Sequence, residues 1–232
     1  MPPPEPAPRR VAVMQPYLFP YAGYFRLFAA ADEFVLYDCV QFPRRGRVHR
    51  SEVGSGRDGP QWLTLPLATQ ARETRIDQLG FAPGARAELD RRLASFPWFE
   101  RGDGDGAEAL RALLRGPLED VVGLLQASLE LSCRLLGLPT RIRRSSSLDI
   151  DPELRGQERV LAIARAVGAG HYLNPPGGRA LYSRERFKQA GLQLEFLSDY
   201  DGPHRHLLPA LMTGPATAVR DDLLARTRIL PA

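Results

Sequence analysis

Short apolar segments alternate with helical ones over residues 140–197, and this alternation constrains the fold more than any other feature. Hydrophobic periodicity predicts three strands there, with a helix between each consecutive pair. The strands are expected over 140–144, 171–174 and 192–197, and the helices over 156–167 and 183–190. A strand–helix–strand connection of this length joins parallel strands. The C-terminal half is therefore expected to form two β–helix–β units.

The N-terminal half predicts strands of a different kind. A short apolar run at 11–14 is expected to be a first buried strand, followed by an aromatic loop and a helix over 24–31. Further strands are expected over 33–41, 47–53, 61–67 and 75–81, and further helices over 85–96, 107–114 and 118–136. Turns at 43–46 and 54–60 would join the strands as an antiparallel meander. The expected class is α/β: a single domain whose mixed sheet combines an N-terminal antiparallel meander with β–helix–β units, flanked by helices.

The length and composition of the chain are those expected of a globular protein. The chain has 232 residues, of which 44% are hydrophobic and 25% charged, which is typical of a soluble globular protein with a sizeable core. Residues 1–10 are expected to form a disordered proline-rich leader, and residues 11–232 one domain. No apolar run reaches the roughly 18–20 residues that span a bilayer, so we expect no membrane insertion and a cytoplasmic location.

The spacing of the cysteines and the type of charged residue restrict the classes of ligand that the protein is expected to bind. Cys39 and Cys133 lie far apart without metal-type spacing, and the four histidines form no zinc motif. We therefore expect free thiols, no metal and no cofactor, with Cys133 buried on an apolar helix. The net charge of +4 rests almost entirely on arginine, and no basic stripe carries interleaved aromatic residues. This pattern favours an anionic ligand and predicts no nucleic-acid partner.

Reactive side chains concentrate in residues 37–53, which hold a cysteine, a histidine and four arginines. An imidazole beside a thiol can take its proton and stabilise the thiolate, so Cys39 and His49 are the candidate nucleophile and base. A three-residue loop at 43–45 would set Cys39 opposite His49, whereas a four-residue loop would set it opposite Arg50. A one-residue slip moves every side chain to the other face. The sequence leaves both registers open, and also a half-buried cysteine beside an unrelated histidine.

Asp38 is the third candidate catalytic residue. It precedes Cys39 on the same expected strand, so its side chain is expected to point to the opposite face. An acid or amide that orients His49 would then come from elsewhere, with Asn174 and Asp149 as candidates. Asp38 or His49 could still act as the base in a direct transfer without a covalent intermediate.

Four arginines lie in and beside the expected turn: Arg44, Arg45, Arg47 and Arg50. Guanidinium groups bind phosphate and carboxylate through paired hydrogen bonds, so a converging set would hold a pyrophosphate or a phosphopantetheine arm. A solvated, charged hairpin is the alternative. The turn at 175–178 offers backbone N–H groups to an anion, but it lacks the ending of a P-loop.

An aromatic, proline-rich loop at 15–23 follows the first expected strand. Ligands of open α/β sheets bind beyond the carboxyl ends of the strands, which makes this loop part of a candidate site. Gln15 and Tyr17 are expected to position a substrate carbonyl, with the alternative that the aromatic residues fill the core. The remaining candidate substrate-binding residues are Tyr24, Gln41 and Asn174.

The chain also carries several longer motifs. They are Met14-Gln-Pro-Tyr-Leu-Phe-Pro-Tyr-Ala-Gly-Tyr-Phe25, Tyr37-Asp-Cys-Val-Gln-Phe42, Trp62-Leu-Thr-Leu-Pro66, Ser146-Ser-Leu-Asp149 and Tyr172-Leu-Asn-Pro-Pro-Gly-Gly-Arg-Ala-Leu-Tyr182. Through these motifs, residues 11–200 resemble the WbqC-like protein family. Many members have Tyr-Asp-Asp-Val where this chain has Tyr37-Asp-Cys-Val40. The family's C-terminal Leu-Ser-x-x-Asp segment is hardly recognisable in residues 204–213.

The resemblance implies a thioester-dependent acyl- or aminoacyl-transferase that acts on an amine, such as an amino sugar or a natural-product intermediate, in bacterial polysaccharide or secondary-metabolite biosynthesis. The expected donor is an acyl or aminoacyl carrier protein or acyl-CoA, and the expected acceptor is a small-molecule amine. Cys39 would take the acyl group, with His49 as base and then acid. The alternatives are a non-catalytic accessory protein that binds a carrier protein or sugar nucleotide, and a thioester hydrolase with the same site.

Overall fold

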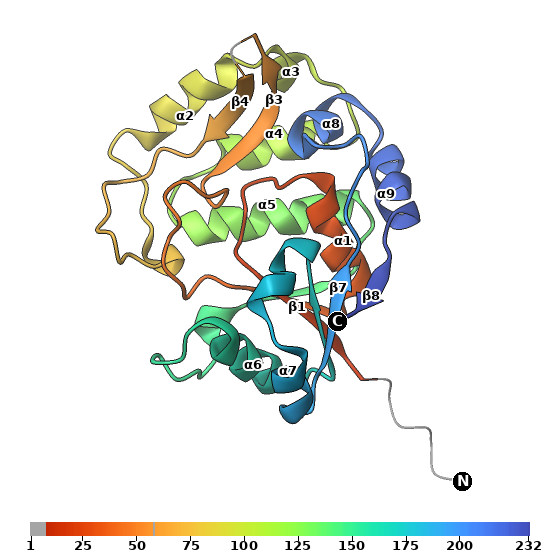
Figure 1. The fold of residues 1–232 in the computed structure, drawn as a ribbon. Helices are drawn as coiled ribbons and strands as arrows, with labels where there is room; N and C mark the ends of the chain where they lie inside the picture. The colour runs from red at the N-terminus through yellow and green to blue at the C-terminus, as the bar shows by residue number, and fades with distance from the viewer. Residues whose placement is uncertain (1–7, 58) are drawn as a thin grey trace.

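Within residues 8–57 and 59–232, which the computed structural model describes, six strands form one central sheet (Figure 1). Their order across the sheet is β5 (Arg141–Arg144), β2 (Glu33–Leu36), β1 (Arg10–Met14), β6 (His171–Asn174), β7 (Gln193–Leu197) and β8 (Ile229–Pro231). Neighbouring strands from β5 to β7 are parallel, and β8 pairs antiparallel with β7. The sheet is therefore mixed, and its parallel part contains the expected strand–helix–strand units.

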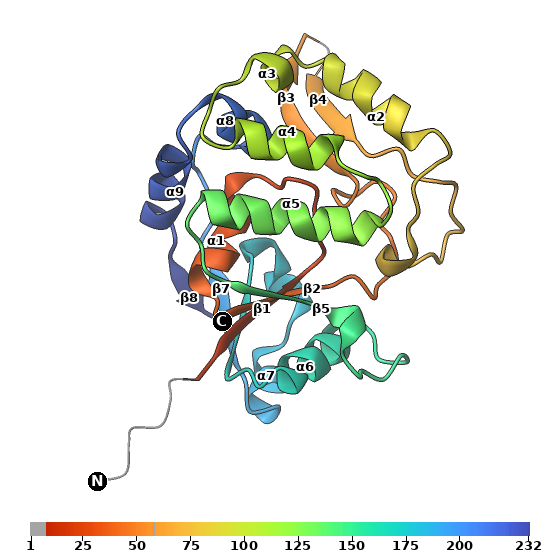
Figure 2. The ribbon, with the colours of Figure 1, turned by 180° about the vertical axis from the view of Figure 1, so that it is seen from behind.

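Helices cover both faces of the parallel strands (Figures 1 and 2). One layer contains α6 (Gly156–Ala166) and α7 (Arg184–Gln189), and the other contains α1 (Ala22–Ala30), α5 (Val121–Leu135) and α9 (Ala216–Ala225). Side chains alternate along β1, so Val11 and Val13 belong to the core beneath α6 and α7, whereas Ala12 belongs to the opposite core. On that second side, Phe28 of α1 stacks on Phe34 of β2, with ring centroids 4.0 Å apart. The stacking ties α1 to the strand that precedes the candidate site.

A hairpin separate from the central sheet lies in the upper part of Figure 1, among short helices. Its antiparallel strands are β3 (Arg50–Gly56) and β4 (Gly59–Thr64). The helices of this lobe are α2 (Ala85–Ala94), α3 (Pro97–Arg101), α4 (Ala107–Arg115) and α8 (Leu207–Thr213). Helix α2 packs on β4, and α8 packs on β3. Buried side chains such as Leu63, rather than a shared backbone ladder, therefore join the hairpin to the rest of the molecule.

The expected α/β class, with a mixed sheet flanked by helices, is confirmed. The arrangement of the N-terminal strands differs, because β2 lies parallel between β1 and β5 and ends at Leu36 instead of continuing to residue 41. Residues 38–42 pair instead with 74–77, where Phe42 N donates to Thr74 O (2.9 Å) and Ile76 N donates to Val40 O (2.9 Å). The strand expected over 75–81 is wrong, because the chain forms a 3-10 turn at Ile76–Gln78.

Ordered structure begins earlier than the sequence predicts. Residues 1–7 of the expected leader lie outside the described part of the chain, but Arg9 and Arg10 are held by buried acids. Arg9 pairs with Glu33, and Arg10 Nε lies 2.6 Å from Glu195. Burial of these carboxylates requires such partners, so the domain includes residues before Val11. Among the described residues, no helix has the length and apolar character needed to cross a membrane.

The strand order places a change of direction between β1 and β6. From β1 the chain moves outward to β2 and then β5, and it returns to β6 and β7 on the other side of β1. Open α/β sheets bind ligands beyond the carboxyl ends of their strands, at a switch of this kind. The segments that follow β1, β2, β5 and β6 begin at Gln15, Tyr37, Ser145 and Pro175. The segments after β2 and β5 contribute Asp38, Cys39, Ser145 and Ser146 to the candidate site, and α6 contributes Arg159.

Candidate active site

Asp38 is a fully buried carboxylate two residues beyond the end of β2. It is held by the turn after β5: Ser145 Oγ donates to Asp38 Oδ1 (2.8 Å), and the backbone N–H of Ser146 donates to the same oxygen (2.9 Å). Ser146 Oγ donates to Asp38 Oδ2 (2.6 Å). A buried carboxylate is costly unless such donors surround it. The adjacent ends of β2 and β5 therefore bring these groups together.

Ser145 also contacts the thiol of Cys39. Its Oγ lies 3.2 Å from Cys39 Sγ and accepts weaker hydrogen bonds from the backbone N–H groups of Asp38 (3.2 Å) and Cys39 (3.4 Å). A hydroxyl can donate one hydrogen bond and accept others, so one serine bridges the thiol and the carboxylate. Because β2 ends at Leu36, strand alternation does not apply to Asp38 and Cys39. The sequence predicts that these two side chains point to opposite faces and cannot act together. In the structure both contact Ser145 Oγ.

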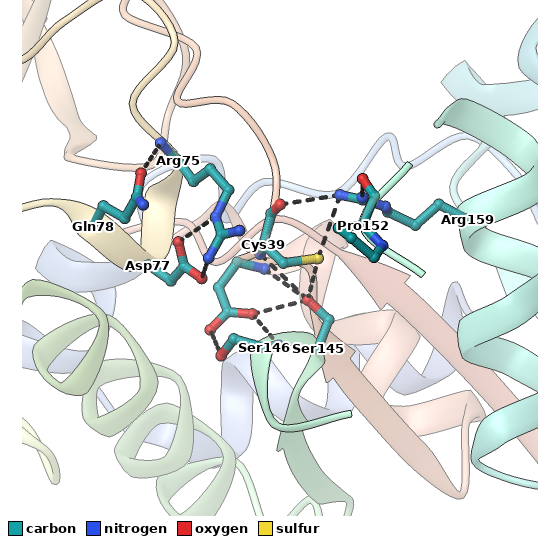
Figure 3. Close-up of polar contacts among 9 residues, drawn as sticks. Cys39, Arg75, Asp77, Gln78, Ser145, Ser146, Pro152 and Arg159 are labelled. Carbon is teal, nitrogen blue, oxygen red and sulfur yellow. Dashed lines mark hydrogen bonds and ion pairs between the residues drawn. The ribbon is translucent and has the colours of Figure 1, made fainter. Parts of the chain in front are cut away.

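Arg159 of α6 approaches Cys39 from the other side (Figure 3). Its side chain is buried, with 7% of the residue exposed. Nη1 donates to Cys39 O (3.1 Å) and lies 3.9 Å from Cys39 Sγ, while Nη2 donates to Pro152 O (2.6 Å). Nε is buried without a partner, and no carboxylate pairs with Arg159 among the described residues. A buried guanidinium without a carboxylate partner favours a negatively charged ligand beside it.

Cys39 and Arg159 line a pocket of about 530 Å³ that is open at the surface. Its rim carries Arg75 and Arg155, together with Glu73 and Glu153. Figure 3 shows Cys39 between Arg75 and Arg159. Arg75 forms two hydrogen bonds to Asp77 (2.9 and 2.7 Å), and these bonds raise the pKa of its guanidinium. The pocket therefore presents a partly exposed thiol between fixed positive groups.

Tyr37 lies next to this pocket. Burial, foremost, and then the nearby Cys39 raise the pKa of its hydroxyl to about 12. The phenol is therefore neutral at physiological pH and is a hydrogen-bond donor. Tyr182 also influences it and forms a hydrogen bond with Tyr172 (3.3 Å between the hydroxyl oxygens). A row of tyrosines thus extends from the Cys39 site toward the end of β6.

His49 lies in a different pocket from Cys39. It shares that pocket with Arg44 and Arg92, and its ring packs edge-on against Phe42, with centroids 5.1 Å apart. Neither of the hairpin registers left open by the sequence forms, because residues 38–42 pair with 74–77 and β3 pairs with β4. Burial, then the charges of Arg50 and Arg92, lower the pKa of His49, and its Nδ1 is buried with no hydrogen-bond partner among the described residues. The structure does not bring the expected cysteine and histidine together.

The four arginines of the expected anion site do not converge. Arg44 Nη2 donates to Gln70 O (2.8 Å) beside the His49 pocket. Arg50 turns back on the loop and donates to the carbonyl oxygens of Gly46 (3.0 Å) and Arg45 (2.6 Å). Arg47 pairs with Glu52 (3.1 Å). Arg44 therefore lies apart from Arg47 and Arg50, whose guanidinium groups both lie over the Trp62 ring, 5.0 and 4.5 Å from its centroid.

The other expected binding residues occupy three environments. Tyr24 is a core residue whose hydroxyl donates to Gln15 O (2.7 Å), and burial raises its pKa; Tyr17 packs on it, with ring centroids 5.4 Å apart. Gln41 lines the Cys39 pocket and donates to Arg72 O (2.7 Å). Asn174 is 2% exposed, and its Oδ1 accepts from Tyr172 (3.3 Å).

Neither residue considered for orienting His49 does so. Asn174 has its own tyrosine partner, and Asp149 is exposed at the surface. Cys133 is buried on α5, as expected, and burial raises the pKa of its thiol. The described part of the chain contains no group of three histidine, cysteine, aspartate or glutamate side chains that could hold a metal ion. Cys39 is therefore the accessible thiol of the candidate site.

Sequence analysis missed Ser145, Ser146 and Arg159. The serines had a usable signal, because they directly follow the predicted strand 140–144 and so lie at a carboxyl end. The sequence also contains a signal for Arg159, which lies four residues before Ile163 on the apolar face of a predicted helix. A charged residue on such a face needs a buried partner. Both signals point to a site without identifying the partner.

The sequence matches the model of the WbqC-like protein family over residues 15–204. An uncharacterized protein of Mycobacterium tuberculosis (strain ATCC 25618 / H37Rv), Rv1507c, is 26% identical over 201 residues, covering 84% of this chain and 84% of that protein. No solved structure matches the chain. The match to the family model spans the segments that carry Asp38, Cys39 and Arg159. The chain belongs to the WbqC-like protein family.

Proposed function

We propose that the protein transfers an acyl or aminoacyl group from a thioester to an amine, with Cys39 as the covalent acceptor. The observation that carries this proposal is the Ser145 hydroxyl between Cys39 Sγ (3.2 Å) and Asp38 Oδ1 (2.8 Å). A thiol is a strong nucleophile only as the thiolate, and it becomes one when a base takes its proton. Asp38, acting through Ser145, is that base, and His49 has no part in the transfer.

The relay balances its protons at each step. The thiol proton passes to Ser145 Oγ, which at the same time gives its own proton to Asp38. The thiolate attacks the carbonyl carbon of the donor, and the carbon–sulfur bond of the donor breaks. The leaving thiolate takes the proton back from the relay. In the second half, the amine attacks the acyl group on Cys39, loses a proton through Ser145, and restores the free thiol.

Arg159 supports the first step in two ways. Its hydrogen bond to Cys39 O (3.1 Å) fixes the backbone at the nucleophile, and its charge lies 3.9 Å from Sγ. A positive charge at this distance stabilises the thiolate and the oxyanion that forms on attack. Arg155 donates only to backbone carbonyl groups among the described residues and is available to a negatively charged carrier arm at the rim.

The donor is an acyl or aminoacyl carrier protein or acyl-CoA, and the acceptor is a small-molecule amine. In this proposal the reaction belongs to the biosynthesis of polysaccharides or secondary metabolites in the cytoplasm, as the resemblance to the WbqC-like protein family implies. The openness of the Cys39 pocket favours a second candidate, a thioester hydrolase in which water replaces the amine. The two activities share the acyl-enzyme and differ only in which acceptor accelerates its breakdown.

Intact-protein mass spectrometry tests the proposal. Wild type and Cys133→Ser are expected to gain the mass of one acyl group from acyl-CoA or acyl-pantetheine thioesters, and Cys39→Ala is expected to gain none. Addition of an amine should then release the acyl group as an amide, whereas a hydrolase would release the free acid at the same rate with or without the amine. An adduct that persists in Cys39→Ala, or no adduct from any thioester in the panel, would rule out the covalent mechanism.

A further inference from the structure

A pocket separate from those of Cys39 and His49 lies where three distant segments meet. Its volume is about 280 Å³, and it is lined by Tyr21, Arg47, Glu52, Tyr200 and Arg205. Tyr21 belongs to the loop after β1 and Tyr200 to the segment after β7, so the pocket stands beyond the carboxyl ends of parallel strands. It shares no lining residue with the Cys39 pocket. Its location on the sheet is one that α/β proteins use for ligands.

The tyrosine rings in this pocket are fixed before any ligand arrives. The Tyr200 hydroxyl donates to Asp222 (2.7 Å), and the Arg26 guanidinium lies 5.2 Å from the centroid of the Tyr200 ring. Tyr21 contacts the same ring, with centroids 5.9 Å apart. A Cβ atom at Gly23 would come within 2.7 Å of the Tyr200 ring, and one at Gly202 within 2.3 Å. Both glycines therefore leave space for Tyr200, which can offer a rigid aromatic surface.

The pocket carries two arginines and one acid. Arg47 pairs with Glu52 (3.1 Å), and its guanidinium lies 5.0 Å from the centroid of the Trp62 ring, which restricts its movement. Arg205 is exposed, and its side chain has no hydrogen bond or ion pair among the described residues. The excess positive charge therefore lies at Arg205. Burial, foremost, raises the pKa of Tyr21, so its hydroxyl stays neutral beside these charges.

We propose that this pocket binds a phosphorylated ring compound of the nucleotide class. The flat ring stacks on Tyr21, because aromatic side chains stack on bases without requiring a particular base, and the Tyr200 ring, tilted by 53° to Tyr21, forms the adjoining wall. The phosphate accepts hydrogen bonds from Arg205 and Arg47, whose planar guanidinium groups match its oxygens. The proposal does not depend on the chemistry of Cys39, because the two pockets are separate.

Isothermal titration with three probes separates the ring from the charge. Uridine diphosphate is expected to bind, ribose 5-phosphate more weakly, and inorganic pyrophosphate, which lacks a ring, weakest of all. Arg205→Gln is expected to weaken uridine diphosphate binding about tenfold, because it removes a charge-assisted hydrogen bond. Tyr21→Ala is expected to weaken it to a similar extent, and Tyr21→Phe, which keeps the ring, is expected to bind like wild type.

Arg184→Gln provides the matched control. Arg184 is also exposed and loses the same charge, but it lines a different pocket, beside His171 at the amino-terminal end of β6. Its affinity for uridine diphosphate should equal that of wild type, as should that of Cys39→Ala. The proposal is overturned if no probe binds at millimolar concentration, or if Arg205→Gln binds like wild type. It is also overturned if Arg184→Gln weakens binding as much, or if pyrophosphate binds as tightly as uridine diphosphate.

Discussion

Cys39 and His49 are ten positions apart in the sequence, but their surroundings differ in how polar groups are satisfied. Around Cys39, the buried Asp38 accepts from two serines, and Ser145 reaches the thiol. Around His49, Nδ1 is buried and no residue in the described part of the chain forms a hydrogen bond with it, and two arginines disfavour the protonated form of the ring. A group that has to exchange protons needs a connected partner, which Cys39 has and His49 lacks. The contrast supports placing the proposed chemistry at the strand ends rather than in the arginine-rich loop.

The largest expected effect separates these two residues by activity. Cys39→Ala is expected to reduce acyl transfer about a thousandfold or more, because it removes the nucleophile. His49→Ala is expected to keep the rate within about threefold, because a proton transfer supplied elsewhere does not pass through this ring. Turnover of an acyl-CoA substrate with a saturating amine measures both. Equal losses in the two variants would break the comparison and restore the pairing of cysteine with histidine.

The next effect tests the bridge between thiol and carboxylate. Ser145→Ala removes the hydroxyl through which Asp38 reaches Cys39, and acylation is expected to slow about a hundredfold. Ser147→Ala is the control: this exposed neighbour donates to Arg144 O (2.8 Å) and does not touch Asp38 or Cys39. Stopped-flow release of the donor thiol gives the acylation rate. A Ser145→Ala variant as fast as Ser147→Ala would exclude the relay.

A stability measurement tests the same region without any substrate. Asp38→Asn keeps the shape of the side chain but mismatches its donors and acceptors with Ser145 and Ser146. The free energy of unfolding is expected to fall by about 2 kcal/mol, the usual cost of a buried polar group left unsatisfied. Asp149→Asn, at an exposed position, is expected to change it by less than about 0.5 kcal/mol. Urea unfolding of both variants provides the comparison, which fails if the two lose equal stability.

The smallest expected effect concerns His49 and pH. Its pKa is lower in the folded protein than in the unfolded chain, so the unfolded chain binds a proton first as the pH falls. The associated stability is present above a pH of about 6.5, the unfolded value, and is lost as the pH drops toward the folded value. The ring is partly exposed to solvent, which weakens the effect of its surroundings on the pKa. The free energy of unfolding therefore changes with pH less steeply than it would if unfolding took up one full proton. Urea unfolding should show a flatter pH dependence for His49→Gln than for wild type, and identical slopes would contradict the assignment.

Local patterns locate β1, β6 and β7, whereas β2, expected in an antiparallel meander, is parallel to both its neighbours. β1, β6 and β7 are short apolar segments whose position a single sequence reveals. No single segment predicts the order of the strands in the sheet, because that order depends on how the crossover helices pack. The bond between Ser145 and Asp38 joins residues 107 positions apart, and that between Arg159 and Cys39 joins residues 120 positions apart.

The end of β2 shows why the candidate site was only half predicted. Residues 37–41 have the alternation of a strand, but Asp38 is satisfied only by the turn after β5, which draws the chain out of the sheet. Asp38 and Cys39 were therefore identified by residue type, whereas their partners were not. Proximity along the chain makes His49 the expected partner of Cys39, but the pairing of residues 38–42 with 74–77 separates the two side chains.

The two edge strands bear on how the molecule meets other chains. β5 carries three arginines in its four residues, and β8 is three residues long and ends in proline. Charge and proline at a sheet edge disfavour the addition of a further strand, and a short edge offers few backbone groups to pair. Sheet extension by a second copy or an extended peptide is thereby opposed at both ends. Recognition is left to the loops at the carboxyl ends of the strands, where the two candidate pockets open.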